Sequence, residues 1–146
     1  MAGKQPKRNA REGVDEYGRT PLHYAASESK VGEVLKRLAS GANPDAQDDN
    51  GWTALHFAAQ SVSPECTEAL LQAGANLRLT DSYGNTALWR AVFCAKGDGS
   101  VISLLRTAGA DPLAKNLKGV TPVSLSRTIA NHDIAKYFFD VIDTGA

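Results

Sequence analysis

The sequence predicts an all-α fold: a solenoid of four helix-turn-helix units joined by β-hairpin-like loops. A nine-residue block occurs four times, as GRTPLHYAA, GWTALHFAA, GNTALWRAV and GVTPVSLSR, and its opening glycines lie 33, 33 and 35 residues apart. A second series, SGAN, AGAN and AGAD, repeats at intervals of 33 and 35 residues. Two independent landmarks that share one period indicate like units stacked side by side.

Each block has the pattern of a first helix. Its third residue is a threonine, which can accept a hydrogen bond from an N–H group at the helix start. A proline follows in two blocks, where the missing N–H group is no loss. The threonines are Thr20, Thr53, Thr86 and Thr121, and the prolines are Pro21 and Pro122.

A second helix follows in each unit. In the first unit, apolar residues recur at helical spacing at Val31, Val34, Leu35 and Leu38. A glycine lies just past the second helix of each of the first three units, where a left-handed residue ends a helix at little cost. The segments that lead to the next block are rich in Asn, Asp and Gly, which favours hairpin-like turns. The expected units are at about residues 18–50, 51–83, 84–118 and 119–146.

The end units differ from the inner ones, as terminal caps must. Glu33, Lys36 and Arg37 make the second helix of the first unit polar where the second unit is more apolar. In the fourth unit we expect residues 137–142 to close a second helix, with Phe138 and Phe139 both buried. We expect residues 15–146 to form one domain, preceded by a flexible basic arm at residues 1–14.

Two extra residues fall in CAKGDGS, between the helices of the third unit. One interpretation is a tolerated insertion in a turn. The other is that the turn Gly97-Asp98-Gly99 contacts a partner.

The TPLHYAA and TALHFAA cores, together with SGAN, AGAN and AGAD, resemble ankyrin repeats over about residues 15–142. The resemblance implies that His23 and His56 hydrogen-bond the neighbouring hairpin. It is specific for the fold but says little about function, because a repeat motif describes how units stack.

Composition and motifs exclude several classes of function. Lys+Arg and Asp+Glu both number 16, so the chain has no net charge to attract nucleic acid or a membrane surface. Long apolar runs and the apolar core of a secretory signal are absent from the sequence, and its two cysteines have no CxxC spacing. We therefore predict a cytoplasmic protein. The His, Cys and Ser positions fit no catalytic or metal pattern, so we predict no enzyme activity, cofactor or metal.

What remains is a surface for another protein. Stacked first helices form a concave face beside the projecting hairpins, and this groove is rigid. Residues that vary from unit to unit on these elements are the candidates for partner binding: Tyr17, Arg19, Asp49, Asn50, Trp52, Gln60, Tyr83, Asn85, Arg90, Phe93 and Lys118. Trp52 and Tyr83 are the strongest, because aromatic residues often dominate binding energies. Each ring could instead fold back over its own hairpin.

The third unit departs from the motif at Trp89, which we expect to pack on the adjoining loop, and at Arg90. Arg90 pairs either with an Asp inside the stack or with an acidic partner residue. Aspartates occur on the middle hairpins and basic residues on the outer ones, which predicts a row that is negative at its centre and suits a basic partner. The aspartates are Asp45, Asp48, Asp49 and Asp81, and the basic residues are Arg19, Lys115 and Lys118.

The leading hypothesis is a non-enzymatic module that holds one folded protein, as a monomer or in a 1:1 complex. The chain also resembles small stand-alone bacterial ankyrin-repeat proteins, which suggests an immunity protein that occludes the active site of a toxin. The third hypothesis is a self-associating structural unit.

Overall fold

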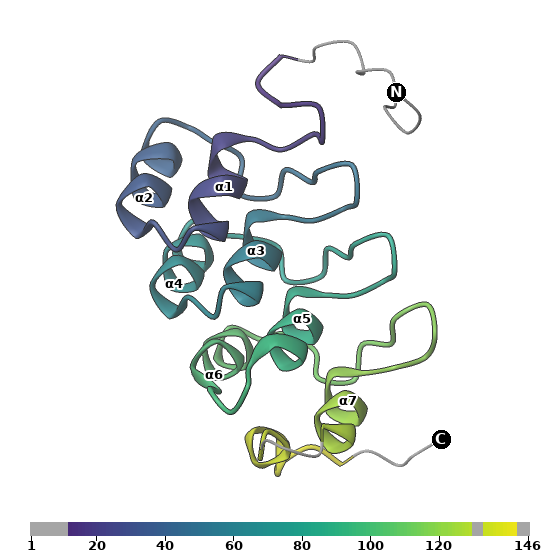
Figure 1. Cartoon of the computed structure of the whole chain (residues 1–146). Coiled ribbons are helices and arrows are strands. Elements are labelled where there is room, and N and C mark those ends of the chain that lie inside the picture. The colour runs from purple at the N-terminus through teal and green to yellow at the C-terminus, as the bar shows by residue number, and fades with distance from the viewer. Residues whose placement is uncertain (1–11, 130–132, 143–146) are drawn as a thin grey trace.

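The computed structural model describes residues 12–129 and 133–142. Figure 1 shows the first helices of the units in one row, the second helices in another, and hairpin loops projecting from the side away from the second row. The described residues thus form the predicted all-α solenoid. The helices are α1 (Pro21–Ser27), α2 (Val31–Ala39), α3 (Ala54–Gln60), α4 (Pro64–Gln72), α5 (Ala87–Cys94), α6 (Ser100–Thr107), α7 (Pro122–Thr128) and the 3-10 helix η1 (Ala135–Phe138).

The first helix of every unit begins at its predicted threonine. The hydroxyl of each threonine accepts the backbone N–H of the residue three positions later. In α1, α3 and α7 the side chain of that later residue accepts the N–H of the threonine in return, which satisfies two N–H groups of the helix start at once. Trp89 holds this place in α5 and cannot return the bond, because an indole only donates.

Four hairpins, at residues 15–19, 48–52, 81–85 and 116–120, share one hydrogen-bond pattern. The first precedes α1, and the other three join successive units. In the second hairpin the N–H of Asp48 donates to the carbonyl of Trp52 at 2.8 Å. The Asp48 carboxylate accepts the N–H groups of Asn50 and Trp52 at 3.0 and 2.8 Å. The equivalent acceptors in the other hairpins are Asp15, Asp81 and Asn116.

Neighbouring hairpins are tied to one another through their backbones. The N–H of Asp49 donates to the carbonyl of Tyr17 at 2.9 Å, and equivalent bonds join the later pairs. The hairpins therefore form one continuous ribbon beside the row of first helices.

The core lies between the two rows of helices. Its largest buried side chains include Leu22, Leu55 and Leu88 from the first helices, and Leu70, Ile102 and Leu105 from the second helices. The only buried residue of α2 is Val34, and its other positions are polar or partly exposed. The first unit therefore has the polar outer face of a cap.

The last unit differs from the prediction. Residues 137–142 do not form an α-helix, because the chain makes a single 3-10 turn that ends at Phe138. Phe138 is buried, whereas Phe139 is 89% exposed, so the expectation that both rings are buried is wrong for Phe139. Successive side chains of a 3-10 turn lie about 120° apart, so two adjacent rings do not face the same side.

The segment that carries Phe138 is fastened to α6. Arg106 Nη1 donates to the carbonyl of Tyr137 at 2.8 Å, and the guanidinium makes two hydrogen bonds with Asp140 at 2.7 and 2.9 Å. The buried Gly99, within the two-residue insertion, lies against the Tyr137 ring, and a Cβ there would overlap that ring. The insertion thus supports the C-terminal segment.

Two expectations fall largely on residues that the structure does not describe. Of the basic arm expected at residues 1–14, only residues 12–14 lie in the described part, and the C-terminal limit of the domain at residue 146 lies outside it. No helix within residues 12–129 and 133–142 combines the length and apolar character needed to cross a bilayer.

Candidate protein-binding surface

A hollow of about 460 Å³ lies between the first helices and the first three hairpins. We call it the inner hollow. It is lined by Arg19, Ser27, Asn50, Trp52, Phe57, Gln60, Tyr83 and Arg90. Six of these eight residues are among the eleven that the sequence predicts for partner binding, and they come from three successive units. Phe57 was not among the candidates because its place in the block predicts burial.

Trp52 lies at the middle of the inner hollow and is half-buried. Its ring centroid is 4.8 Å from that of Phe57 and 5.9 Å from that of His56, both on α3. The guanidinium carbon of Arg90 lies 4.7 Å from the centroid of the Trp52 ring. The ring therefore packs on the helix that follows its hairpin while one part of it stays exposed.

Arg90 is paired inside the stack, which confirms one of the two alternatives for this residue. Its Nη2 lies 3.8 Å from Oδ2 of Asp81, whose side chain is fully buried. Arg19 makes the same kind of pair with Asp48, at 3.2 Å. Both guanidinium groups also lie over aromatic rings: Arg19 over Tyr17, Tyr24 and Phe57, and Arg90 over Trp52, Trp89 and Phe93.

These pairs weaken the charge pattern expected for the hairpins. Asp48 and Asp81 are 6% and 5% exposed, because their carboxylates accept backbone N–H groups of their own hairpins and face an arginine. Asp45 is half-buried and accepts the N–H of Asn76 at 2.7 Å. Asp49 stays exposed, so the negative centre that the sequence predicts is smaller than expected.

The other five candidates are dispersed. Tyr17 and Phe93 are exposed beside the inner hollow, where each contacts one of its arginines. Asp49 and Lys118 are exposed but do not line it. Asn85 is buried, and its Oδ1 accepts a hydrogen bond from Asn116 at 2.9 Å. Asn85 therefore joins two hairpins and is inaccessible to a partner.

Trp89 stacks on Phe93, one helical turn later, with ring centroids 5.5 Å apart. Its indole N–H is buried and has no hydrogen-bond partner. Its aromatic partner thus lies on the same helix, α5, and its packing on the adjoining loop stays a prediction.

The two motif histidines are buried parts of the fold. Nε2 of His23 donates to the carbonyl of Trp52, and Nε2 of His56 donates to that of Asn85, each at 2.9 Å. Their Nδ1 atoms accept the N–H groups of Thr20 and Thr53. Burial lowers the pKa of both imidazoles. The bonds to the neighbouring hairpins confirm what the family resemblance implies.

The described residues hold no cluster of three or more His, Cys, Asp or Glu side chains that could bind a metal ion. Cys66 and Cys94 are both thiols, and burial raises the pKa of each above its ordinary value. A raised pKa reduces the thiolate fraction, which is the reactive form.

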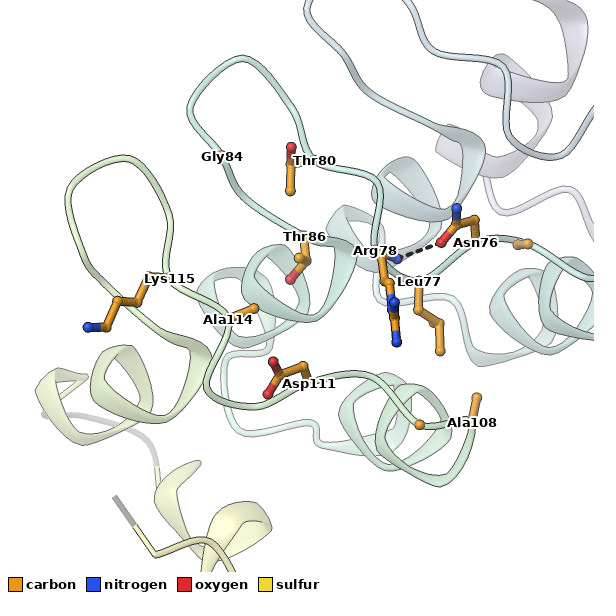
Figure 2. Close-up of a pocket in the computed structure, with 12 residues that line it drawn as sticks. Asn76, Leu77, Arg78, Thr80, Gly84, Thr86, Ala108, Asp111, Ala114 and Lys115 are labelled. Carbon is orange, nitrogen blue, oxygen red and sulfur yellow. Dashed lines mark hydrogen bonds between the residues drawn. The ribbon is translucent and has the colours of Figure 1, made fainter. Parts of the chain in front are cut away.

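A second hollow, of about 560 Å³, opens where the chain leaves α4 and α6 for the next hairpins. Figure 2 shows Thr80 and Gly84 on one hairpin, Lys115 near the next, and Asp111 on the connection after α6. None of the eleven candidates lines this hollow. Its charged side chains Arg78, Asp111 and Lys115 are exposed, and its polar and apolar residues are mixed.

Comparison with known proteins agrees with the geometry. A family model described as ankyrin repeats (3 copies) matches residues 22–116, which is more than half of the chain. The search of curated proteins finds no match. Ankyrin repeats generally serve as protein–protein interaction modules, and the family is typically non-enzymatic. The repeated threonine caps, the histidine bonds to the next hairpin and the matched residues together show that the chain belongs to the ankyrin-repeat family.

Proposed function

We propose that this chain is a non-enzymatic module that holds one folded protein partner against the inner hollow and its hairpins. One observation carries the proposal: Trp52, Tyr83, Arg19 and Arg90, from three successive units, line one hollow. Trp, Tyr and Arg are the residue types that most often dominate binding energies, at about 2 kcal/mol or more each.

The way these side chains are held supports the proposal. Tyr83 is 68% exposed, yet its backbone N–H donates to Asp81 and its carbonyl accepts the N–H of Leu117. Trp52 is held by Phe57 and Arg90. A surface that is ordered before the partner arrives loses little entropy on binding, so more of each contact contributes to affinity.

The two alternative functions have weaker support. The immunity hypothesis is based on resemblance to small bacterial ankyrin-repeat proteins, and acidic hairpins would mimic the anionic substrate of the toxin. The burial of Asp48 and Asp81 weakens that mimicry. Self-association would use Phe93 or the terminal Phe138-Phe139 pair. Phe138 is buried, Phe139 is exposed at the C-terminal end, and Phe93 is exposed beside the inner hollow, where the proposed partner would cover it. We propose a monomer that forms a 1:1 complex in the cytoplasm.

The test is capture of a partner from the source cell on the immobilised full chain, followed by binding measurements with that partner. Tyr83→Ala should weaken binding about 30-fold, because a hot-spot contact contributes about 2 kcal/mol. Trp52→Ala should weaken it at least as much. Tyr83 is the cleaner site, because its exposure predicts an unchanged melting temperature.

Phe139→Ala is the matched control, since it removes an exposed aromatic ring outside the inner hollow. This variant should bind the partner as the original chain does. A partner that binds Tyr83→Ala and the original chain equally would contradict the proposed surface. Light scattering that shows a mass rising with concentration, and reversed by Phe139→Ala, would support self-association instead.

A further inference from the structure

The inner hollow presents cations, although the chain as a whole has no net charge. The side chains of Arg19 and Arg90 keep 28% and 16% of their surface exposed, whereas those of their partners Asp48 and Asp81 keep 1% and 0%. No Asp or Glu among the described residues lines the hollow. A group that enters it therefore meets the guanidinium groups, and the two carboxylates lie beneath them.

Arg90 has hydrogen-bonding capacity left over. A guanidinium carries five N–H donors. The 3.8 Å contact with Asp81 is an ion pair longer than a hydrogen bond. Nε has no hydrogen-bond partner among the described residues, but it is buried, so an entering group has to use the Nη donors. Oδ1 of Asp81 is already bonded to the N–H groups of Tyr83 and Asn85. The charge of Arg90 is thus compensated, but its donors are only partly used.

The aromatic rings around Arg90 determine how those donors can be used. Arg90 lies 4.7 Å from the centroid of Trp52 and 5.3 Å from that of Phe93. Rings cover the faces of a guanidinium well, but its N–H donors point outward in its plane, where a carboxylate fits best. The side-chain amides of Asn50 and Gln60, in the same hollow, supply further donors.

We propose that the inner hollow receives an acidic side chain from an exposed loop of the partner. Arg90 and Arg19 bind the carboxylate, and Trp52 and Tyr83 contact the apolar stem of the same loop. This inference rests on the proposed function. It reverses the partner charge that the sequence suggests, because the cations lie at the surface and the carboxylates beneath them. A lysine in the same place would meet two like charges.

Two defined peptides test the proposal on the full chain. Both are acetylated and amidated pentapeptides, Gly-Leu-Glu-Phe-Gly and Gly-Leu-Gln-Phe-Gly, which differ only in the charge of the central side chain. The readouts are the nuclear magnetic resonance signals of the Trp52 indole N–H and of the Arg19 and Arg90 Nε–H groups. The Glu peptide at millimolar concentration should shift these signals, and the Gln peptide should bind at least about tenfold more weakly.

Added salt should weaken the binding of the Glu peptide, because part of the attraction is electrostatic. Equal shifts with the two peptides, or no shift with either, would overturn the proposal. This arm needs no substitution and so does not depend on whether a variant folds.

Variants provide the second arm. Arg90→Gln should abolish the preference for the Glu peptide, and Arg90→Lys should restore only part of it, because an ammonium lacks the planar donors. The matched control is Arg78→Gln, which removes an exposed arginine from the second hollow and should leave the preference unchanged. Loss of the preference in Arg78→Gln would show that the overall charge, not the inner hollow, selects the peptide.

The two proposals can fail separately. If Tyr83→Ala abolishes partner capture but the peptides bind alike, the binding surface stands and the acidic side chain is wrong. If the Glu peptide is preferred but Tyr83→Ala leaves partner capture unchanged, the hollow binds carboxylates and the proposed partner surface is wrong.

Discussion

In the first two units a buried histidine joins the first helix to the following hairpin, whereas the third unit has a tryptophan at that place. His23 and His56 each accept a threonine N–H and donate to a carbonyl in the next hairpin. Trp89 cannot accept the threonine N–H, because an indole only donates, and its own buried N–H finds no hydrogen-bond partner among the described residues. The hairpin that follows Trp89 is held by backbone bonds and by the bond between Asn116 and Asn85.

The two ends of the stack therefore derive stability from different sources. The first two units repeat one set of local hydrogen bonds, so each unit supports its neighbour in the same way. The last unit depends on single contacts: the buried ring of Phe138, the ring of Tyr137 against Gly99, and the bonds from Arg106. We therefore expect a substitution at the C-terminal end to remove one of these contacts and to leave the others in place.

The largest effect should come from Phe138→Ala. Phe138 is 2% exposed, and removing a buried phenylalanine ring costs about 3–5 kcal/mol in the free energy of unfolding. Phe139→Ala should change it by no more than about 0.5 kcal/mol, because that ring is 89% exposed. Urea unfolding of both variants measures the difference. Equal losses would mean that the segment forms a regular helix which buries both rings.

The next largest effect should come from Gly51→Ala, with Gly119→Ala as its matched control. Both glycines have a left-handed backbone, with φ of 80° and 77°. A Cβ on Gly51 would lie 2.9 Å from Cα of Asp81, whereas a Cβ on Gly119 would have no atom within 4 Å.

Left-handed strain costs about 1–2 kcal/mol at either glycine, and the close contact should add about 1–3 kcal/mol at Gly51 only. Thermal unfolding of the two variants at one pH measures how much more stability Gly51→Ala loses than Gly119→Ala. Equal losses would show that the second and third hairpins are not packed together as the structure has them.

The difference between the two halves also explains what the sequence could predict. The threonine caps and the glycines past the second helices are features of one unit, and the repeat period reveals them. The histidine bonds join adjacent units, and the resemblance to ankyrin repeats implies them. Phe139 was misjudged because the alignment of units assumes an α-helix, and the chain makes a 3-10 turn there. No local pattern distinguishes these two outcomes.

The candidate surface was predictable by position but not by charge. Six of the eleven candidates line the inner hollow. The burial of Asp48 and Asp81 was missed because an Asp in a turn is expected to be exposed to solvent. Asp49, next to the buried Asp48, is indeed exposed. The positions of Asp15, Asp48 and Asp81, 33 residues apart, were a signal that each has the same role in its hairpin.

A smaller effect should appear with pH at the two motif histidines, which lie in the first two units. Burial lowers the pKa of His23 and His56, although the nearby Asp48 and Asp81 oppose the shift. The unfolded chain then binds protons near pH 6.5 while the folded chain does not, so stability is full above about pH 6.5 and falls as the pH drops below it.

Imidazole signals followed by nuclear magnetic resonance should show that both rings titrate below the ordinary pKa of histidine. Amide exchange should rise on acidification, after correction for the intrinsic rate, more in residues 48–53 and 81–86 than in residues 116–121. If both rings titrate at their ordinary pKa, the bonds of the neutral imidazole to the hairpins do not form in solution.

The smallest effect should come from Arg106→Gln, and it should be local. Arg106 joins α6 to the C-terminal segment through the Tyr137 carbonyl and Asp140, but the Asp140 side chain is 53% exposed, so water screens much of that pair. Amide exchange in residues 134–141 should become roughly tenfold faster, and the bulk unfolding transition should hardly move. Arg37→Gln removes an exposed pair with Glu33 on α2 and is the control, because no other contact depends on it in the described hydrogen bonds and ion pairs. Faster exchange across all units in Arg106→Gln would mean that the C-terminal segment supports the whole stack, and the two ends would then not be independent.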